Sequence, residues 1–487
     1  MANDDYPFKT KPFEHQLDCW NKSRDKTIWA LFMEMGTGKT KVIIDTVAYL
    51  FDNKEIDGVL IVAPKGAYRD WSRPETGEIA LHMPEHIKHT VAYWSGFITK
   101  AQMKSYDKIM WDDNRLHIFV VNVEAIATEG CRKLVRRFLA CHQSFMCVDE
   151  STTIKNRQAL RSKAVIDLGG MATYRRILSG MPVTQSPMDL YSQCMFLHPK
   201  LLGFSSFFAF RNRYAITQKV YMGTRAFDKV VGYQRLEELT HKLETFSTRV
   251  TKDECLDLPE KIYMYREVEM TDEQEKMYHQ MRENSLILLD NMQLITAAMA
   301  MNQIMMLQQI VSGFISDPAS GNVIHIKNNR VQETLHILSE TQGKVLIWAC
   351  YRQNIRDLYE AIYKEYGAEA VATYFGDTSS DEREEYKIRF QNPDDPLRFF
   401  ILNPATGKFS LTLTQAKTVI YYTNDYSLEK RTQSEDRAHR IGQTDHVVYI
   451  DLITPNTVDE RIIKALKAKR NISDIIMGEE GLREWLQ

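Results

Sequence analysis

Cysteine is scarce in this sequence and follows no regular spacing. The 487-residue chain contains seven cysteines, and no two of them stand as Cys-x-x-Cys. This argues against a zinc ribbon and against a disulfide framework, both of which need spaced cysteines. We therefore expect reduced thiols in a cytoplasmic protein, in a bacterium or in an infected host cell.

An excess of charge of one sign is also absent. Lys and Arg total 62 against 64 for Asp and Glu, which gives a formal net charge of −2. A protein without an overall basic field can bind nucleic acid only through local clusters. Any basic contact surface must therefore be confined to a groove or to a few loops.

Long apolar runs are few. Residues 1–6 are acidic and polar, unlike a signal peptide. The single membrane-like candidate, residues 291–316, carries no charge, but asparagine and glutamine interrupt it. Its apolar positions suit a buried helix better than a membrane span. We therefore expect no membrane partner.

Short apolar runs alternate with amphipathic stretches in both halves of the chain. Runs of this length, separated by helical patterns, are typical of buried parallel strands in an α/β fold. The strands expected in the first half are Ile28–Met33, Val59–Ala63, Ile118–Asn122, Phe145–Asp149 and Arg176–Ser179. Those expected in the second half are Val345–Ala349, Val371–Phe375, Phe399–Asn403, Thr418–Tyr422 and Val447–Leu452.

Between the halves, from about 199 to 331, the pattern changes to helices rich in Met, Gln and Phe. Residues 251–260 have the composition of an exposed linker. The sequence thus predicts two α/β lobes, each with a helical protrusion. The predicted lobes are residues 1–250, with a protrusion at about 199–248, and residues 251–487, with a protrusion at about 270–316.

The glycine-rich segment that begins at Met33 has the features of a phosphate-binding loop. Gly36 and Gly38 allow the tight turn that points backbone N–H groups at a phosphate. The helix expected to start near Lys39 would direct its positive end to the same place. Lys39 would reach the β- and γ-phosphates, and the Thr40 hydroxyl would bind Mg²⁺. Met33 itself departs from the small residue usual at that position.

An upstream glutamine is a further candidate for nucleotide binding. Gln16 could pair with an adenine edge through its amide, as amides do with that base. The alternative is a surface glutamine with no role. The full predicted set is Gln16, Met35, Gly36, Thr37, Gly38, Lys39, Thr40 and Lys41.

Two acidic residues, Asp149 and Glu150, end an apolar run about 110 residues after the loop. At the carboxyl end of a strand, Asp149 can hold Mg²⁺ together with Thr40. Glu150 can orient and deprotonate the attacking water. An Asp-Glu pair is common by chance, but its place downstream of a phosphate loop supports the catalytic interpretation.

Near the end of the chain, Gln433–Gln443 contains two arginines three positions apart. Residues at this spacing share one face of a helix. Arg437 and Arg440 on one face could grip a transferring phosphate, because guanidinium is planar, forked and always charged. A nucleotide site at one end and an arginine pair at the other suggest two lobes that close on ATP.

Together these residues resemble the Swi/Snf-like family of DNA-dependent ATPases in helicase superfamily two. The resemblance covers nearly the whole chain and is most specific at Gln433–Gln443, which is nearly the family's motif VI. The other matching segments are Glu34–Thr40, Val62–Pro64 with Trp71, Asp149 with Glu150, Ser179–Pro182, Arg249–Lys252 with Leu258 and Pro259, and Gly376–Ser379 with Arg383 and Phe390. The resemblance implies two tandem RecA-like lobes and a minimal motor of viral or bacterial type.

By this resemblance, Arg437 and Arg440 act as arginine fingers from the second lobe on ATP bound mainly to the first. Fingers of this kind contribute about three to five orders of magnitude in turnover. The family moves along double-stranded DNA, which we expect to be held through phosphates. The expected DNA contacts, each of which could equally be a solvated surface residue, are Lys65, Arg69, Asn122, Arg352, Gln353, Thr378 and Lys408. Trp71 is expected in the core.

Three segments depart from the family pattern. Ser151 and Thr152 follow the Asp-Glu pair, where the family has a small residue and then a histidine that couples hydrolysis to lobe closure. Residues 406–413 form a degenerate motif V, without the usual glycine-rich run. Residues 426–428 replace the family's Trp-Asn-Pro with Tyr-Ser-Leu.

The leading hypothesis is an ATP- and Mg²⁺-dependent motor that translocates on double-stranded DNA and remodels DNA or protein–DNA complexes. One alternative is a strand-separating DNA or RNA helicase, and another is a nucleotide-gated DNA clamp with little turnover. The departures favour the clamp, whereas the intact Lys39, Glu150, Arg437 and Arg440 argue against it. A single chain supplies both halves of the ATP site, so no oligomer is required.

Overall fold

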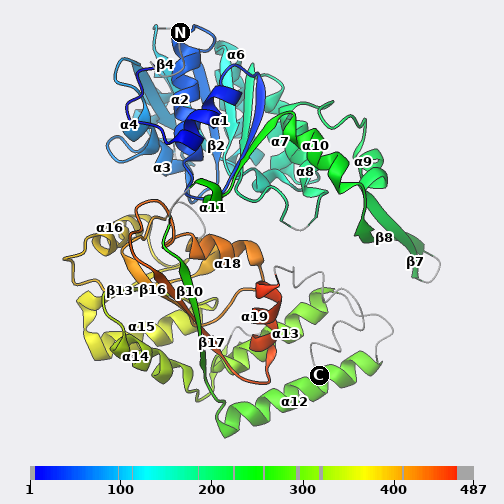
Figure 1. The fold of residues 1–487 in the computed structure, drawn as a ribbon, viewed down its shortest axis with the longest axis vertical. Coiled ribbons are helices and arrows are strands. Elements are labelled where there is room, and N and C mark those ends of the chain that lie inside the picture. Colours follow the sequence, from blue (N-terminus) through cyan, green and yellow to red (C-terminus); the bar gives the residue numbers. More distant parts are fainter. Residues whose placement is uncertain are drawn as a thin grey trace. The chain divides into compact units, whose positions relative to one another are not determined.

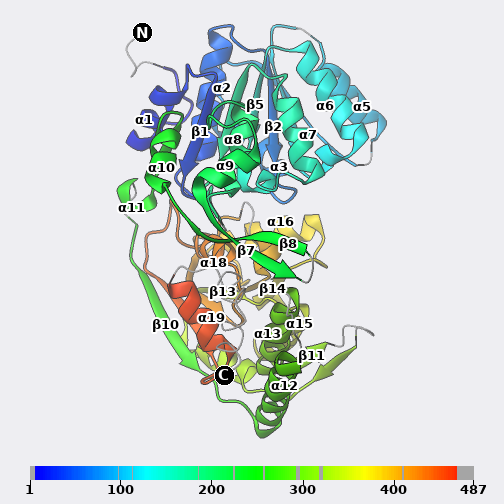
Figure 2. The ribbon, with the colours of Figure 1, turned by 90° about the vertical axis from the view of Figure 1, so that its right-hand side faces the viewer.

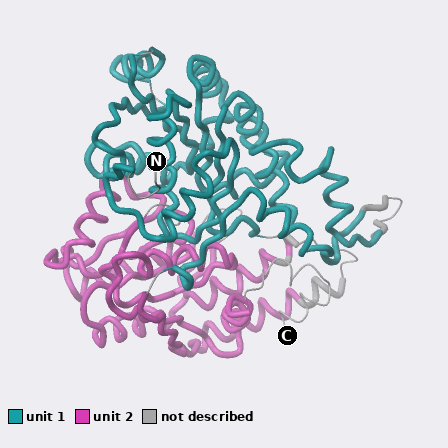
Figure 3. The backbone as a smooth tube through the Cα atoms, turned by 45° about the horizontal axis from the view of Figure 1, so that its top comes forward, with its two compact units in different colours: residues 1–256 teal, residues 257–487 magenta. Residues whose placement is uncertain are grey.

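Parallel strands form the centre of each half of the chain, as the continuous apolar runs predict. The computed structural model describes residues 6–96, 98–111, 113–184, 186–222, 225–255, 258–291, 297–316, 322–407 and 411–468. The chain divides into two units, Met1–Leu256 and Asp257–Gln487, which Figure 3 distinguishes by colour.

Seven parallel strands form the main sheet of unit 1 (Figure 1), in the order β3-β4-β2-β5-β6-β1-β9. The strands are β1 Ile28–Met33, β2 Gly58–Ala63, β3 His89–Tyr93, β4 Leu116–Asn122, β5 Ser144–Val148, β6 Tyr174–Leu178 and β9 Ser247–Val250. Five of them were expected, and their ends agree with the prediction to within two residues. Because the strands are parallel, their carboxyl ends meet at one edge of the sheet, where ligands bind in folds of this class.

Helices cover both faces of this sheet (Figure 2), and each face has its own apolar cluster. One face carries α1 Glu14–Ser23, α2 Lys39–Asp52, α3 Tyr68–Ser72 and α4 Glu78–His82. The other carries α5 Lys100–Lys108, α6 Glu129–Cys141, α7 Leu160–Gly169, α8 Asp189–Leu197, α9 Phe207–Tyr214 and α10 Leu236–Glu244. Short 3₁₀ turns, η1 Ala125–Ala127 and η2 Ser151–Ile154, follow β4 and β5. The buried strands explain why their sequences are apolar at every position rather than at alternate ones.

A β-hairpin interrupts the region for which the sequence predicts helices only. Strands β7 Ala215–Met222 and β8 Arg225–Tyr233 pair antiparallel and extend away from the main sheet of unit 1 (Figure 1). The helical prediction is wrong for this stretch, because residues such as Ile216, Thr217 and Val230 are β-branched and prefer extended backbone. The expected linker at 251–260 begins instead with a short helix, α11 Lys252–Cys255.

Six parallel strands form the main sheet of unit 2, in the order β10-β17-β16-β13-β15-β14. The strands are β10 Lys261–Glu267, β13 Lys344–Trp348, β14 Val371–Tyr374, β15 Phe399–Leu402, β16 Ala416–Tyr421 and β17 Val447–Ile453. All five strands expected in this half are confirmed, again to within two residues at their ends. The additional strand, β10, lies at the edge of the sheet, where its side chains are largely exposed and leave no apolar run in the sequence.

Helices also flank the sheet of unit 2. The cluster on one face includes α14 Arg330–Glu340 and α15 Arg352–Tyr366, and the cluster on the other includes residues of α16 Ser380–Gln391. A separate cluster joins α12 Asp272–Asn291 and α13 Ala297–Val311 to α19 Val458–Lys467. The remaining elements are β11 Phe314–Ser316, β12 Val323–His325, η3 Ala368–Ala370, α17 Pro404–Gly407 and α18 Leu428–Glu435. Within the described part of the chain, no helix combines the length and the apolar character needed to cross a bilayer.

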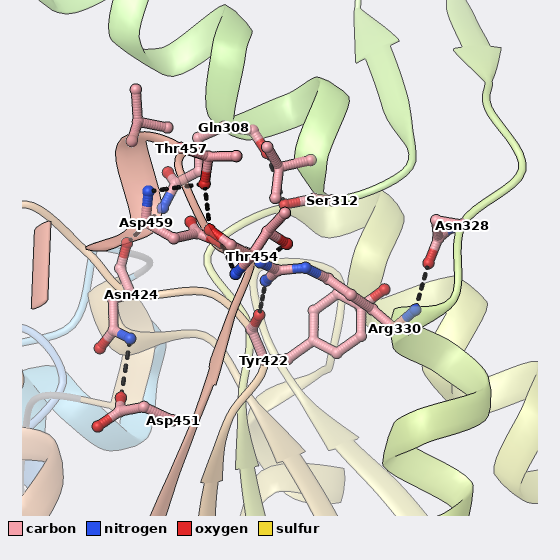
Figure 4. Close-up of polar contacts among 12 residues, drawn as sticks. Gln308, Ser312, Asn328, Arg330, Tyr422, Asn424, Asp451, Thr454, Thr457 and Asp459 are labelled. Carbon is pink, nitrogen blue, oxygen red and sulfur yellow. Dashed lines mark hydrogen bonds and ion pairs between the residues drawn. The ribbon is translucent and has the colours of Figure 1, made fainter. Parts of the chain in front are cut away.

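A buried arginine joins three elements of unit 2 (Figure 4). Arg330, the first residue of α14, forms an ion pair with Asp459 at the start of α19. Its Nη1 donates to the carbonyl of Tyr422 at 2.6 Å, and its Nη2 donates to Thr454 Oγ1 at 3.0 Å. Burial raises the pKa of Asp459, and the guanidinium of Arg330 opposes that rise. The two charges are therefore tolerated in the interior only as a pair.

We predict that Arg330→Met lowers the free energy of unfolding by about 3–5 kcal/mol, because it leaves the buried carboxylate of Asp459 without a cation. Without Arg330 the pKa of Asp459 rises further, so the folded chain keeps a proton that the unfolded chain has lost above about pH 4. The destabilisation should therefore be larger at pH 8 than at pH 5 in urea unfolding of the full chain.

The matched control is Arg356→Met, because Arg356 pairs with Asp377 at 3.2 Å on the exposed surface of the same unit. A surface ion pair contributes about 0–1 kcal/mol, so this variant should unfold almost as the wild-type chain does. An Arg330→Met destabilisation that did not change with pH would contradict the account of Asp459.

Candidate active site

Three loops meet at the carboxyl edge of the sheet in unit 1. They follow the adjacent strands β1, β6 and β5 and contain the glycine-rich loop, the segment Ser179–Pro182, and Asp149 with Glu150. A Cβ added to Gly180 would lie only 3.2 Å from the backbone nitrogen of Met35. Glycine at position 180 therefore allows the loop after β6 to lie directly against the glycine-rich loop.

The glycine-rich loop adopts the conformation that the sequence predicts. Gly36 and Gly38 have positive φ angles of 84° and 89°. Helix α2 begins at Lys39, so its free N–H groups and its positive end face the loop. The Lys39 ammonium donates to the carbonyls of Met33 at 2.8 Å and Glu34 at 3.2 Å. The loop thus combines backbone donors with a cation, which is a cradle for a polyphosphate.

Helix α1 braces this loop through two side chains. Gln16 Nε2 donates to the carbonyl of Thr37 at 3.1 Å, and His15 Nε2 lies 2.8 Å from the same oxygen. Gln16 Oε1 accepts from the backbone N–H of Phe13 at 3.1 Å. A Cβ on Gly38 would lie 2.1 Å from Gln16 Nε2 and would displace this amide, and the φ angle of 89° at Gly38 also favours glycine. Both ends of the Gln16 amide thus bind the protein, and its contact with adenine stays a prediction.

The structure separates Lys41 from the other loop residues. Its ammonium forms an ion pair with Asp45 at 2.8 Å inside α2 and lies 5.3 Å from the centre of the Phe8 ring. Burial raises the pKa of Asp45 to about 6, although the hydrogen bond from Lys41 opposes this rise. Lys41 can therefore offer a phosphate its backbone N–H but not its charge. Thr40 lies in the first turn of α2, as a Mg²⁺ ligand at this position requires.

Asp149 is held by two hydrogen bonds at the end of β5. Its Oδ2 accepts from the indole Nε1 of Trp71 at 3.1 Å, and its Oδ1 accepts from the N–H of Glu150 at 3.0 Å. Desolvation raises the pKa of Asp149, whereas the Lys39 ammonium and these hydrogen bonds lower it. Trp71 is buried, as expected, but the sequence did not show that its indole orients a carboxylate of the site.

Glu150 stands in a left-handed conformation, with φ of 48°. A non-glycine residue is strained there, so the surrounding structure must hold it. The next residue supplies part of that support, because Ser151 Oγ donates to Gln193 Oε1 at 2.6 Å. Gln193 Nε2 then donates to the carbonyl of Pro182 at 2.7 Å. Ser151, which stands where the family has a small residue, is thus linked through Gln193 to the loop after β6. Gln193 lies 42 positions from Ser151 and belongs to no motif, so the sequence did not indicate its role.

The arginine pair of unit 2 does not lie on a helix face. Helix α18 ends at Glu435, and both arginines follow in the turn beyond it. The Nη1 atoms of Arg437 and Arg440 each lie 3.2 Å from the carbonyl oxygen of Leu411, to which both donate. The expectation of one helix face is wrong, but a shared acceptor still brings the two guanidiniums together. The degenerate motif V supplies that acceptor.

The expected DNA contacts of unit 1 lie after β2 and β4, which are neighbours in the sheet. Lys65 and Arg69 are exposed, and the Arg69 guanidinium stacks 4.3 Å from the centre of the Tyr93 ring. Asn122 is buried, and its Oδ1 accepts from the N–H of Ala125 at 2.8 Å. Lys65 and Arg69 thus lie on the surface, where their contact with DNA stays a prediction, whereas Asn122 shapes the turn after β4.

In unit 2 the expected contacts gather at the start of α15 and in the turn after β14. Arg352 is exposed and pairs with Asp377 at 3.1 Å. Gln353 Nε2 donates to Asp357 Oδ1 at 2.7 Å, and Thr378 Oγ1 donates to the carbonyl of Thr373 at 3.2 Å. The structure therefore brings Arg352 beside the turn that contains Thr378. The last candidate, Lys408, lies outside the described residues.

Two domain families match this chain. The SNF2-related domain matches residues 14–313, and the helicase conserved C-terminal domain matches residues 326–442. The chain belongs to the SNF2-related family. It is a helicase-like ATPase of that family, and its two parallel sheets are the tandem RecA-like lobes expected from the motif order.

Curated relatives are similar to this SNF2-related chain over most of its length. It is 26% identical to the SWI/SNF chromatin-remodeling complex subunit snf22 of Schizosaccharomyces pombe, over 96% of this chain and 27% of that protein. It is 28% identical to the transcription regulatory protein SNF2 of Saccharomyces cerevisiae, over 90% of this chain and 26% of that protein. The chain therefore spans about a quarter of the length of these two relatives.

A solved structure is also similar. The Sulfolobus solfataricus SWI2/SNF2 ATPase core in complex with dsDNA aligns with 99% of this chain and 98% of that one, at 22% identity and a TM-score of 0.43. A second structure, the Sulfolobus solfataricus SWI2/SNF2 ATPase core domain, aligns with 99% of this chain and 95% of that one, at 23% identity and a TM-score of 0.41.

We predict that Trp71→Phe weakens Mg²⁺-dependent ATP binding, because it removes the hydrogen bond to Asp149 and keeps an aromatic ring. A hydrogen bond to a charged group contributes about 1.5–3 kcal/mol, so the loss should be about 10-fold or more. ATP binding titrated at several Mg²⁺ concentrations measures it. The control is Trp29→Phe, which removes an indole hydrogen bond of 3.0 Å to Thr248 elsewhere in unit 1. Equal losses in both variants would contradict a role for Trp71 at Asp149.

Proposed function

We propose that this SNF2-related chain hydrolyses ATP with Mg²⁺, translocates on double-stranded DNA and thereby remodels DNA or protein–DNA complexes. The proposal is carried by one observation, the meeting of the glycine-rich loop with Asp149 and Glu150 at one edge of the sheet in unit 1. A phosphate cradle beside a metal-binding acid and a candidate base is the arrangement that nucleotide hydrolysis needs.

The roles follow from the donors present. The Lys39 ammonium and the loop N–H groups hold the β- and γ-phosphates, and the hard oxygens of Thr40 and Asp149 suit Mg²⁺. Bound Mg²⁺ would neutralise developing phosphate charge. Glu150 orients the attacking water and accepts its proton. The Trp71 indole keeps the Asp149 carboxylate in place, and the N–H of Glu150 does the same at the other oxygen.

Arg437 and Arg440 supply the remaining positive charge. Their guanidiniums are held at a common acceptor, the carbonyl of Leu411, which keeps the two charges close together. An arginine beside a transferring phosphate stabilises the charge of the transition state, which raises kcat by about three to five orders of magnitude. We propose that both arginines act in this way on the bound nucleotide.

We propose that nucleic acid is bound through contacts to its phosphates rather than recognised through its base sequence. The chain has a formal net charge of −2, so binding depends on local donors such as Lys65, Arg69 and Arg352. The Schizosaccharomyces pombe relative is a subunit of a chromatin-remodeling complex, and this chain spans about a quarter of that protein.

The test is steady-state ATP hydrolysis by the purified chain, alone and with duplex DNA, single-stranded DNA or RNA. We expect duplex DNA to stimulate turnover most, and stimulation to fall steeply as salt rises, because phosphate contacts release counterions. Lys39→Ala should remove ATP binding and turnover under every condition. Stimulation by single strands or RNA alone would favour a helicase, and ATP binding without turnover would favour a nucleotide-gated clamp.

Glu150→Gln is predicted to separate binding from chemistry. The amide keeps the size of the side chain but cannot accept the proton, so turnover should fall about 10²–10⁴-fold while ATP affinity stays nearly unchanged. Single-turnover hydrolysis and equilibrium ATP binding measure the two effects. Glu129→Gln, on the exposed surface of α6 with its partner Lys133 at 2.8 Å, is the control. Wild-type turnover in Glu150→Gln would rule out Glu150 as the base.

A further inference from the structure

The helix that precedes the arginine pair is anchored by one buried guanidinium. Arg431, in the middle of α18, pairs with Asp451 of β17, with Nη2 3.1 Å from Oδ2. Its Nε donates to Glu435 Oε1 at 2.8 Å, and its guanidinium stacks 3.5 Å from the centre of the Tyr421 ring. All of these groups are largely buried, so the position of α18 depends on what holds Arg431.

Asn424 joins this cluster to a second helix. Its Oδ1 accepts from Arg431 Nη1 at 2.6 Å. Its Nδ2 donates to Asp451 Oδ1 at 2.8 Å, as Figure 4 shows. Its backbone carbonyl accepts from Gln308 Nε2 at 2.9 Å. Gln308 belongs to α13, so a short series of hydrogen bonds runs from the helical protrusion of unit 2 to the helix before the arginines.

Gln308 extends the series to the loop after β13. Its Oε1 accepts from the hydroxyl of Tyr351 at 2.7 Å, and its side chain is fully buried. Tyr351 immediately precedes Arg352 and Gln353, two of the proposed DNA contacts. Because both ends of the Gln308 amide are used, the glutamine fixes the loop after β13 and the loop after β16 at the same time.

Apolar packing follows the same route. One cluster contains Ile304 and Leu307 of α13, and the partly buried Leu428, the first residue of α18, packs against it. Interior contacts of this density transmit displacement rather than absorb it. The hydrogen bonds and the packing together form the continuous physical contact that coupling within one unit requires.

We propose that Gln308 is a positioning residue that couples nucleic-acid binding to ATP turnover. Nucleic acid held at Arg352 would set the position of Gln308 through the adjacent Tyr351. Through Asn424 and Arg431, that position determines where α18 ends and where Arg437 and Arg440 are held. The inference rests on the proposed function, because it concerns how DNA stimulates this ATPase.

The experiment compares Gln308→Met with Gln309→Met. Gln309 is the next residue of the same helix and is also buried, but its Oε1 accepts from the N–H and hydroxyl of Ser316, at 3.1 and 3.2 Å, rather than from Tyr351. Both variants replace a buried amide by a thioether of similar length. We measure kcat and KM for ATP with and without duplex DNA, duplex affinity, and thermal unfolding.

We expect Gln308→Met to lower the DNA-stimulated kcat about 10-fold and to leave KM, duplex affinity and the DNA-independent rate within about twofold. Gln309→Met should keep the full stimulation ratio at a similar thermal stability. Tyr351→Phe removes the hydroxyl that donates to Gln308 Oε1 and should also lower the ratio of DNA-stimulated to DNA-independent kcat. The double variant Gln308→Met/Tyr351→Phe should lose no more than Gln308→Met alone, because both act through one contact.

Each outcome decides the matter. Equal stimulation ratios in Gln308→Met and Gln309→Met, with a stimulated wild-type chain, would overturn this inference and leave the proposed function intact. A Gln308→Met variant that lost basal and stimulated turnover by the same factor would also overturn it. If Gln308→Met does not fold, Tyr351→Phe alone decides, and an unchanged ratio there overturns the inference. A wild-type chain that duplex DNA does not stimulate would overturn the proposed function and this inference with it.

Discussion

The parallel register of β5, β6 and β1 is the constraint on which the candidate active site depends. Val148 pairs with Ile177, and Leu178 pairs with Leu31, so the three strands end at nearly the same height. The loops that follow them must therefore share one edge of the sheet. A slip of one residue would turn every side chain of a strand to the opposite face, which the two apolar clusters forbid. The packing of these three strands, which carry no catalytic group themselves, thus determines where the catalytic loops lie.

Buried polar side chains add the precision that packing alone does not give. In unit 1, Gln16, Trp71 and Gln193 each fix a different loop of the site, and none of them needs to touch a substrate. In unit 2, Arg330 holds α14 against α19, and Arg431 holds α18, the helix before the turn with Arg437 and Arg440, against β17. Each such group is expensive to bury unless its hydrogen bonds are made, so the bonds specify one arrangement of the loops.

The sequence predicts the interior of the fold well and its periphery poorly. Buried parallel strands are apolar at every position, which makes them visible, and a phosphate loop between a strand and a helix is visible through its glycines. Edge strands such as β3 and β10 lack that signal, and so does the short β9. The spacing of Arg437 and Arg440 predicts a helix, but the two residues lie in the turn after α18, because spacing alone does not distinguish the two. Partners such as Gln193 and Gln308 could not be found, because their contacts join positions far apart in the chain.

The bond between Ser151 and Gln193 has a consequence for how this chain can change by descent. Each side chain is the other's hydrogen-bonding partner in a buried place, so a single replacement leaves one polar group unsatisfied beside the acid of the site. The two positions are therefore constrained together, and Gln193 is constrained further because its Nε2 also donates to the carbonyls of Pro182 and Asp189. The family motif covers one end of this bond, whereas its other end lies 42 positions further along the chain, outside any motif.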